Sequence, residues 1–447
     1  MALVTPVTEH VAGRSLPWPF RNHRLTVALL ALLVTIVWRV FLVSHFSIAI
    51  GALELVVMVL LMGWAAWRIV QRWLDNDWRL NGLELYAMVL LLVPFLSAVA
   101  ARREYDQPFI WGLVAFKDYY LLLGVLVVHR WLRRGWITLG QVEQALLAVA
   151  WACLIYFYFA TLFINPAPYQ DSPLAGANDV KGGGVYYRFN MCALYYGAIY
   201  YAARGFMRNR WPDLVYAALF AAYVVVFRMD RTSMAVTVVG MVGAVLWNVP
   251  WQRIAKVALV AFLPTLFAAL LVFLLAPAKV EQYKYMFMDA LHTVSGGQEQ
   301  AAEVSVRTVE AAIAKRQVDK HPWIGNGRIS RSWNEQGYDG YYGFFYPADV
   351  GMLGLVFLYG YPGTVLLYLL FPIAALWAWR TRGWRHDLFL VSARFTLLAL
   401  FLDSLTNGQL TQTPGQALLF VAILHYCRQM RPDKAEAGGT APAMGLA

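Results

Sequence analysis

The chain has 447 residues, of which 60% are hydrophobic and only 14% are charged, and it contains 18 Trp. Several apolar runs reach the roughly 20 residues that cross a bilayer as a helix, so the composition excludes an ordinary soluble protein. The formal net charge of +11 does not indicate nucleic-acid binding, because much of the positive charge lies in short segments between apolar spans, as membrane topology requires.

Hydropathy predicts an all-α polytopic membrane protein with about twelve transmembrane helices. We place them at 25–44, 48–69, 83–100, 109–128, 140–163, 190–206, 212–228, 232–248, 255–276, 347–377, 387–403 and 413–427. The domains that follow are a cytoplasmic arm (1–24), a nine-helix region (25–276), a long periplasmic catalytic loop (277–346), a three-helix region (347–431) and a disordered cytoplasmic tail (432–447).

The distribution of Lys and Arg predicts the orientation. With the N-terminus in the cytoplasm, the seven inner segments carry 20 of the 37 Lys and Arg, two or three in each. Cytoplasmic loops are enriched in these residues. We therefore expect a multi-pass protein of the bacterial inner membrane with both termini in the cytoplasm.

Three cations, Arg39, Lys117 and Arg394, fall inside predicted spans. Ionisable groups there are candidates for function, although an ion pair closed within the bundle is the structural alternative. Lys117 and Arg394 are retained as a candidate in-membrane polar site. A charged path through the bundle would suit a transporter.

Further arginines stand at the predicted periplasmic ends of spans. Arg188 closes the Gly- and Pro-rich segment 164–189, which is expected to be irregular. Arg228 and Arg231 flank the short turn Arg-Met-Asp-Arg-Thr-Ser. Guanidinium groups bind phosphate oxygens bidentately, so all three are pyrophosphate-binding candidates. The alternatives are an interfacial Arg188 and a structural pair with Asp230.

The long loop contains an amphipathic helix, then a sharp turn and a run of aromatic residues. We expect Ala302, Val306, Val309 and Ile313 to form the apolar face of the helix, with Arg307 on another face. His-Pro-Trp-Ile-Gly-Asn-Gly follows at 321–327. Aromatic rings can form an interfacial belt or bind sugar rings. The glycan-binding candidates are Trp333, Tyr341, Tyr342 and Tyr346. The histidines and cysteines show no ligand spacing, so no metal and no cofactor is predicted.

The second half of the chain, roughly 180–375, resembles the bacterial O-antigen ligase and O-antigen or exopolysaccharide polymerase superfamily. The resemblance rests on the Arg231-Thr232 step that opens a span, on Arg307, on the 321–327 motif and on the paired glycines within 349–370. It implies a GT-C-like enzyme that transfers a glycan from undecaprenyl pyrophosphate to an acceptor hydroxyl, with inversion and without metal. Arg231 and Arg307 would then hold the pyrophosphate.

One position departs from the ligase pattern. The ligases resembled here carry a His-Asn step, the usual candidate base, where this chain has Asp349. A carboxylate can serve as a base or as a partner of a site arginine. Asp349 joins Arg231 and Arg307 as a catalytic candidate, and the departure favours a polymerase.

A ligase acting on the lipid A core or on protein Ser or Thr is the alternative, and a lipid-linked oligosaccharide flippase or other transporter is a second one. The expected partners are the lipid-linked donor, an acceptor glycan and the bilayer, with a chain-length regulator as a further candidate.

Overall fold

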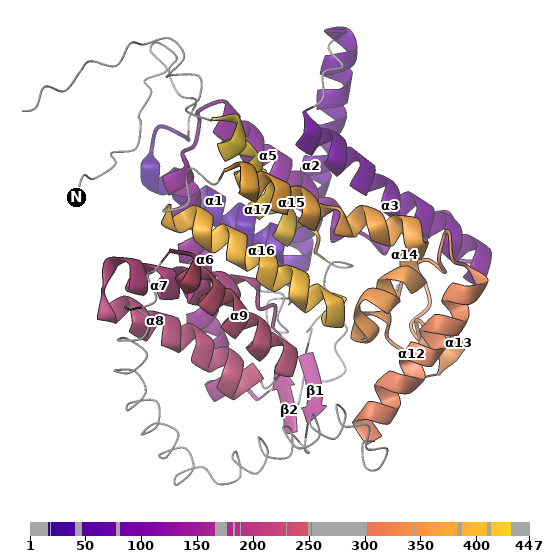
Figure 1. The fold of residues 1–447 in the computed structure, drawn as a ribbon. Coiled ribbons are helices and arrows are strands. Elements are labelled where there is room, and N and C mark those ends of the chain that lie inside the picture. The colour runs from indigo at the N-terminus through magenta and orange to yellow at the C-terminus, as the bar shows by residue number, and fades with distance from the viewer. Residues whose placement is uncertain are drawn as a thin grey trace, which may run out of the picture.

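The protein is mainly helical along its whole described length (Figure 1). The computed structural model describes residues 17, 19–40, 47–76, 81–165, 177–181, 184–187, 189–228, 230–248, 252, 302–331, 333–343, 345–381, 387–408 and 413–430. Its helices are α1 (His23–Trp38), α2 (Ser47–Leu74), α3 (Gly82–Tyr105), α4 (Phe109–Val114), α5 (Leu123–Arg133), α6 (Leu139–Phe163), α7 (Cys192–Arg208), α8 (Trp211–Ala222), α9 (Arg231–Asn248), α12 (Ala302–Lys320), α13 (Asp339–Tyr342), α14 (Gly351–Tyr368), α15 (Leu370–Arg380), α16 (Leu388–Asn407) and α17 (Gly415–Gln429). Short 3-10 or π turns are η1 (Tyr119–Leu122), η3 (Tyr223–Arg228) and η4 (Pro347–Val350).

The prediction of a multi-pass membrane protein is confirmed. Within the described residues, six helical segments are long and apolar enough to cross a bilayer: Ala52–Leu74, Gly82–Tyr105, Leu139–Phe163, Trp211–Arg228, Pro347–Arg380 and Leu388–Asn407. Shorter apolar helices occupy His23–Trp38 and Arg231–Trp247, and α7 and α17 coincide with two further predicted spans. The predicted span 255–276 lies outside the described residues, so the count of twelve stays a prediction.

Three of the spanning helices begin at polar capping residues. The Asn81 side chain accepts a hydrogen bond from the Glu84 amide at 2.9 Å, and Thr138 accepts one from the Gln141 amide at 3.2 Å. The Asp387 side chain caps α16 in the same way. Such caps satisfy amides that have no partner within the helix, and they set the first residues of α3, α6 and α16.

The predicted span 109–128 is not one helix, and that prediction is wrong. Helix α4 ends at Val114, residues 115–118 form tight turns, and η1 and α5 follow. The Phe116 and Lys117 amides donate to carbonyls only three residues back, at 3.0 and 3.1 Å. The interruption coincides with a buried ion pair between Asp118 and Arg39.

The predicted span 347–377 is also divided. A straight helix from 347 to 380 would be about 50 Å long, whereas the hydrocarbon core is about 30 Å thick. The backbone breaks at Gly360, where φ is 65° and ψ is 179°. Beyond the break the chain runs beside α3, and the Tyr86 hydroxyl donates to the Leu366 carbonyl at 2.6 Å. The part after Gly360, residues 361–380, has the length of one bilayer crossing.

Residues before the break pack with the rest of the long loop. Helices α12 and α13, turn η4 and residues 351–359 of α14 lie together at one side of the helical bundle (Figure 1). We call this unit the loop assembly. It rests on the end of α3, because the Arg328 amide donates to Ser97 Oγ at 3.0 Å.

The motif at 321–327 completes the hydrogen bonds that the break at Gly360 interrupts. The Asn326 amide donates to the Phe357 carbonyl at 2.8 Å, the Gly327 amide to the Leu358 carbonyl at 3.0 Å, and the Tyr361 amide to the Pro322 carbonyl at 2.8 Å. Broken helices persist in membrane proteins where neighbouring backbone satisfies the freed groups. We call residues 321–327 the splint, because their backbone groups make the hydrogen bonds that hold the two parts of α14 together across the break.

Glycines let the remaining helices approach closely. A Cβ on Gly240 would lie 2.5 Å from Ile199 and 3.6 Å from Ala399, and one on Gly243 would lie 2.5 Å from Phe395. These contacts bring α9 against α7 and make it antiparallel to α16. Small residues at helix contacts are typical of membrane bundles.

The segment 164–189 was predicted to be irregular, and part of it is a hairpin. Strands β1 (Ala177–Lys181) and β2 (Gly184–Tyr187) form an antiparallel pair. The all-α prediction is therefore correct for the architecture but omits this hairpin. Alternating apolar residues are too few here to predict strands.

Candidate functional site

Asp349 lies against the C-terminal end of α16. A Cβ on Gly351 would clash with the Leu405 carbonyl oxygen, and one on Gly408 would fall 3.0 Å from the Ala348 backbone. Turn η4, which carries the half-buried Asp349, is thus pressed on the last turn of α16. The Asp349 amide donates to the Tyr346 carbonyl at 3.0 Å, which fixes the turn.

Arg231 reaches the same end of α16 from a different helix. It is the first residue of α9 and its side chain is exposed. Behind it, the Tyr195 hydroxyl donates to Ser233 Oγ at 2.9 Å, and Ser233 donates to Asp230 at 2.7 Å. Since α9 is antiparallel to α16, its first residues stand level with the last residues of α16. Arg231 and Asp349 therefore flank one helix end.

Arg228 precedes Arg231 by one turn of chain and points inward. It ends the π turn η3, and its Nε atom is buried without a hydrogen-bond partner among the residues that the structure describes. An unsatisfied buried donor is costly. The position is compatible with an anion-binding role, which stays a prediction. Arg188 lies outside the described residues.

Arg307 belongs to the helix that supports Asp349. Helix α12 packs on η4 and on α14, although the Arg307 side chain lies outside the described part. One turn later, Glu310 is almost fully buried at 1% exposure, and its Oε1 accepts a hydrogen bond from the Tyr346 amide at 3.0 Å.

The predicted apolar face of α12 is wrong at Val309, whereas Ile313 packs against the core; the side chains of Ala302 and Val306 lie outside the described part. Val309 is 56% exposed, whereas Glu310, Ala314, Gln317 and Val318 are buried. The buried face of α12 includes Glu310 because the Tyr346 amide in the loop needs a hydrogen-bond acceptor, and this requirement outweighs the spacing of the apolar residues. Glu310 was missed because periodicity assigns a carboxylate to the solvent side.

The four glycan-binding candidates do not form one surface. The Tyr341 ring lies 4.8 Å from Tyr105 at the end of α3, and the hydroxyls of Tyr105 and Tyr342 are 3.1 Å apart. Tyr341 is 44% exposed, whereas Tyr342 packs inward and burial raises its pKa. Burial also raises the pKa of Tyr338. These two rings are chiefly packing residues, and Trp333 is half-buried.

Tyr346 lies apart from those rings, near Arg39 and Glu310. Among the described aromatic residues between 302 and 359, the most exposed is Trp323, at 73%. It was not among the candidates, because it stands inside the 321–327 motif and not in the aromatic run.

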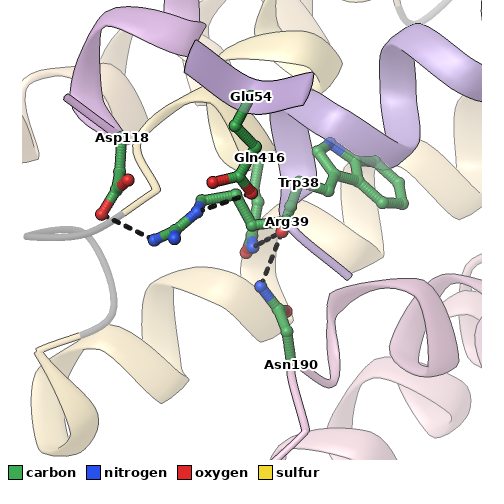
Figure 2. Close-up of polar contacts among 6 residues, drawn as sticks. All are labelled: Trp38, Arg39, Glu54, Asp118, Asn190 and Gln416. Atoms are coloured by element: carbon green, nitrogen blue, oxygen red, sulfur yellow. Dashed lines mark hydrogen bonds and ion pairs between the residues drawn. The ribbon is translucent and has the colours of Figure 1, made fainter. Parts of the chain in front are cut away.

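A buried ion cluster joins α1, α2 and the interruption after α4. Figure 2 shows Arg39 between two carboxylates: its Nε lies 3.0 Å from Glu54 Oε1 and its Nη1 lies 2.6 Å from Asp118 Oδ2. Arg39 has φ 53° and ψ 40°, which turns its side chain out of the line of α1. The Trp38 carbonyl accepts from Asn190 at 2.9 Å and from Gln416 at 3.0 Å.

Of the three cations predicted to lie inside spans, Arg39 is accounted for by this ion cluster, whereas Lys117 and Arg394 are not part of it. Arg39, not Lys117, neutralises Asp118, and Lys117 is exposed. Arg394 donates to the Thr381 carbonyl at 2.8 Å at the end of α15. It stands 13 residues before the end of α16, roughly 20 Å of helix. The structure does not bring Lys117 and Arg394 together.

No group of three or more His, Cys, Asp or Glu side chains in the described ranges is arranged to hold a metal ion. The cysteines Cys153, Cys192 and Cys427 are free and buried. Metal independence stays a prediction.

Comparison with known proteins identifies one domain in the second half of the chain. Residues 216–368 match the family model described as O-antigen ligase, and a search of the curated proteins found no match. The matched segment contains Arg228, Arg231, Arg307, the 321–327 splint and Asp349. The match supports the resemblance to the O-antigen ligase and polymerase superfamily that the sequence pattern predicted, and it covers about a third of the chain.

Proposed function

We propose that the protein polymerises lipid-linked glycan repeat units at the periplasmic face of the inner membrane. The growing glycan leaves undecaprenyl pyrophosphate and joins a hydroxyl of the next lipid-linked unit. The observation that carries the proposal is that Arg231 and Asp349 flank the same end of α16, one in a helix start and one in a turn braced by α12.

This glycosyl transfer requires positive charge near the departing pyrophosphate, on one side of the anomeric carbon, and a base near the acceptor hydroxyl, on the other side. The acceptor oxygen attacks that carbon, and the bond to the pyrophosphate oxygen breaks with its electron pair. Arg231 and Arg307, with Arg228 and Arg188 as further contributors, stabilise the departing pyrophosphate; preorganised donors of this kind supply much of catalysis. Asp349 accepts the proton of the acceptor hydroxyl.

A ligase reaction is the second candidate, because the family model that matches the chain is described as O-antigen ligase. There the same donor is used, but the acceptor is the lipid A core or a protein hydroxyl. The substitution of Asp349 for the histidine of the ligase pattern favours the polymerase. The transporter alternative relied on Lys117, Asp118 and Arg394. Of these, Asp118 pairs with Arg39, and Arg394 donates to the Thr381 carbonyl at the end of α15.

The test is complementation of a deletion strain, with surface and lipid-linked glycans resolved on gels. Arg231→Ala, Arg307→Ala and Asp349→Ala should each remove long polymer while single repeats persist. Arg208→Ala is the matched control, since Arg208 is exposed at the far end of α7. Loss of all attached glycan, with polymer retained on its lipid carrier, would indicate the ligase. Normal glycans in the Arg231 and Asp349 variants would refute the site.

A further inference from the structure

Arg328 is a half-buried guanidinium whose charge no described carboxylate balances. It directly follows the 321–327 splint, and its backbone is held at both sides: its amide donates to Ser97 Oγ at 3.0 Å and its carbonyl accepts from Gln107 Nε2 at 3.1 Å. The guanidinium lies over the Phe116 ring, 5.5 Å from its centroid. Its Nη1 atom is buried, with no hydrogen-bond partner among the residues described.

The groups that face Arg328 are aromatic and neutral. Tyr338 and Tyr359 lie within electrostatic range of its charge. Nearby carboxylates are already engaged: Asp118 is held by Arg39 at 2.6 Å, and Glu104 lies 3.0 Å from His321. A buried charge without a counterion is strongly unfavourable, so a rigidly presented guanidinium of this kind is suited to an anion that arrives with a ligand.

Lys117, the residue after Phe116, is a second positive charge close in the chain to Arg328's ring contact, and it also lies within electrostatic range of Glu54. Its side chain is exposed, and within the described chain it has no ion pair. Figure 2 shows why Asp118, the next residue, is not its partner, because that carboxylate turns toward Arg39. The interruption of the span at 115–118 is what places a lysine here.

The surface that leads to Lys117 is apolar. Ile110 and Val114 of α4 are 65% and 42% exposed, and the Lys117 amide donates to the Val114 carbonyl at 3.1 Å. In a helix that belongs to a membrane bundle, exposed apolar side chains face lipid. An anion bound at Lys117 and Arg328 would therefore have a hydrocarbon chain lying along α4.

We propose that Arg328 and Lys117 form a second anion site, which binds the pyrophosphate of the lipid-linked acceptor. This inference rests on the proposed function and deepens it. A polymerase must hold two lipid pyrophosphates at once, one on the growing chain and one on the incoming unit, whereas a ligase holds one. The donor site is at Arg231 and Asp349 on the end of α16; the acceptor site is at the end of α3, under the same loop assembly.

The test is the stoichiometry of sugar-free undecaprenyl pyrophosphate on the full-length protein, measured by native mass spectrometry from lipid nanodiscs. The wild type should bind two molecules. Arg328→Ala combined with Lys117→Ala should bind one, with affinity at the second site lowered roughly 10- to 100-fold, as expected for lost charge-assisted hydrogen bonds. Arg331→Ala, an exposed arginine three residues further on, is the control and should bind two.

The outcomes separate the two proposals. Loss of one molecule in the Arg231→Ala variant, and of the other in the Arg328 and Lys117 variant, supports both sites. If only the Arg231 variant loses a molecule and the wild type binds one, the acceptor site is refuted and the donor site stands. If only the Arg328 and Lys117 variant loses one, the donor site fails and this inference stands. Arg328→Lys, which keeps the charge but not the bidentate donor, should bind the second molecule more weakly and elute as a folded monodisperse protein.

Discussion

Gly325 and Gly360 meet backbone to backbone: a Cβ on Gly325 would lie 2.6 Å from the amide nitrogen of Gly360. Both residues have positive φ, 72° and 65°, a region that favours glycine. The contact is the point at which the 321–327 splint enters the break of α14. It ties the loop assembly to the membrane span by main-chain hydrogen bonds, so the position of Asp349 depends on it.

Gly360→Ala should prevent stable folding of the loop assembly. The conformation at Gly360 is nearly exclusive to glycine, at a cost of about 1–3 kcal/mol for other residues, and the new methyl group would clash with the Trp323 carbonyl oxygen. The measurement is the fraction of protein that remains monodisperse in detergent after heating. Gly63→Ala in α2 is the control; nothing lies within 4 Å of that position, and the change should be neutral or stabilising. Equal behaviour of the two variants would contradict the splint.

Arg39→Met should destabilise the bundle by about 3–5 kcal/mol, because it leaves two carboxylates buried without their cation. Replacing all three groups, as Arg39→Met with Glu54→Gln and Asp118→Asn, should recover most of that loss. Thermal unfolding in detergent measures both. Arg72→Met provides the comparison: its pair with Glu84 spans 2.7 Å but is more exposed, so we expect about 0–1 kcal/mol. A triple variant as unstable as the single one would argue against charge burial as the cause.

Asp349→His should restore part of the activity that Asp349→Ala loses. Removal of a general base typically lowers rate by about 10²–10⁴-fold. A histidine must be neutral to accept a proton, so the activity of the His variant should be present above about pH 6.5 and fall as the pH decreases through that value. Polymer formation from lipid-linked repeats, assayed between pH 5 and 8, tests this. Activity of Asp349→Ala close to wild type at every pH would remove Asp349 from the mechanism.

Glu310→Ala should loosen η4 without disturbing the spans. It deprives the Tyr346 amide of its acceptor, a loss of about 1–3 kcal/mol for a buried donor, while Glu310→Gln retains a carbonyl oxygen at that place. We expect faster proteolysis within the loop assembly and reduced polymer in the Ala variant, with the Gln variant close to wild type. Glu335→Ala, an exposed carboxylate of the same loop, is the control. If Glu335→Ala has the same effect, the Tyr346 contact is not responsible.

Hydropathy located the helices well, because apolar length is a local property of the sequence. The predicted spans 83–100 and 140–163 correspond to α3 and α6, with ends set by Asn81 and Thr138. Whether a helix runs without interruption, in contrast, is not a local property of the sequence. The interruption at 115–118 depends on Arg39, which lies far away in the chain, and the break at Gly360 depends on the amides of 326 and 327.

Part of the candidate site could be predicted from the sequence, because arginines are unusual at the predicted periplasmic ends of membrane spans. Arg228 and Arg231 were found in that way, and the position of Asp349 was found by its place before the paired glycines. Glu310 was not found, because its partner is a backbone amide. Arg328 was not found either. A single arginine after a glycine-rich turn does not indicate a site in the sequence, and its position over the Phe116 ring is known only from the structure.

The carbonyl of Trp38 constrains the order in which the protein is built. Its two donors, Asn190 and Gln416, follow it by 152 and 378 positions in the chain. During synthesis Arg39 can pair with Glu54 as soon as α2 enters the membrane, but Asp118 and Asn190 arrive later and Gln416 arrives with α17. The end of α1 is therefore completed only after α17 has been synthesised, and a chain truncated before α17 would leave the Trp38 carbonyl without the hydrogen bond from Gln416.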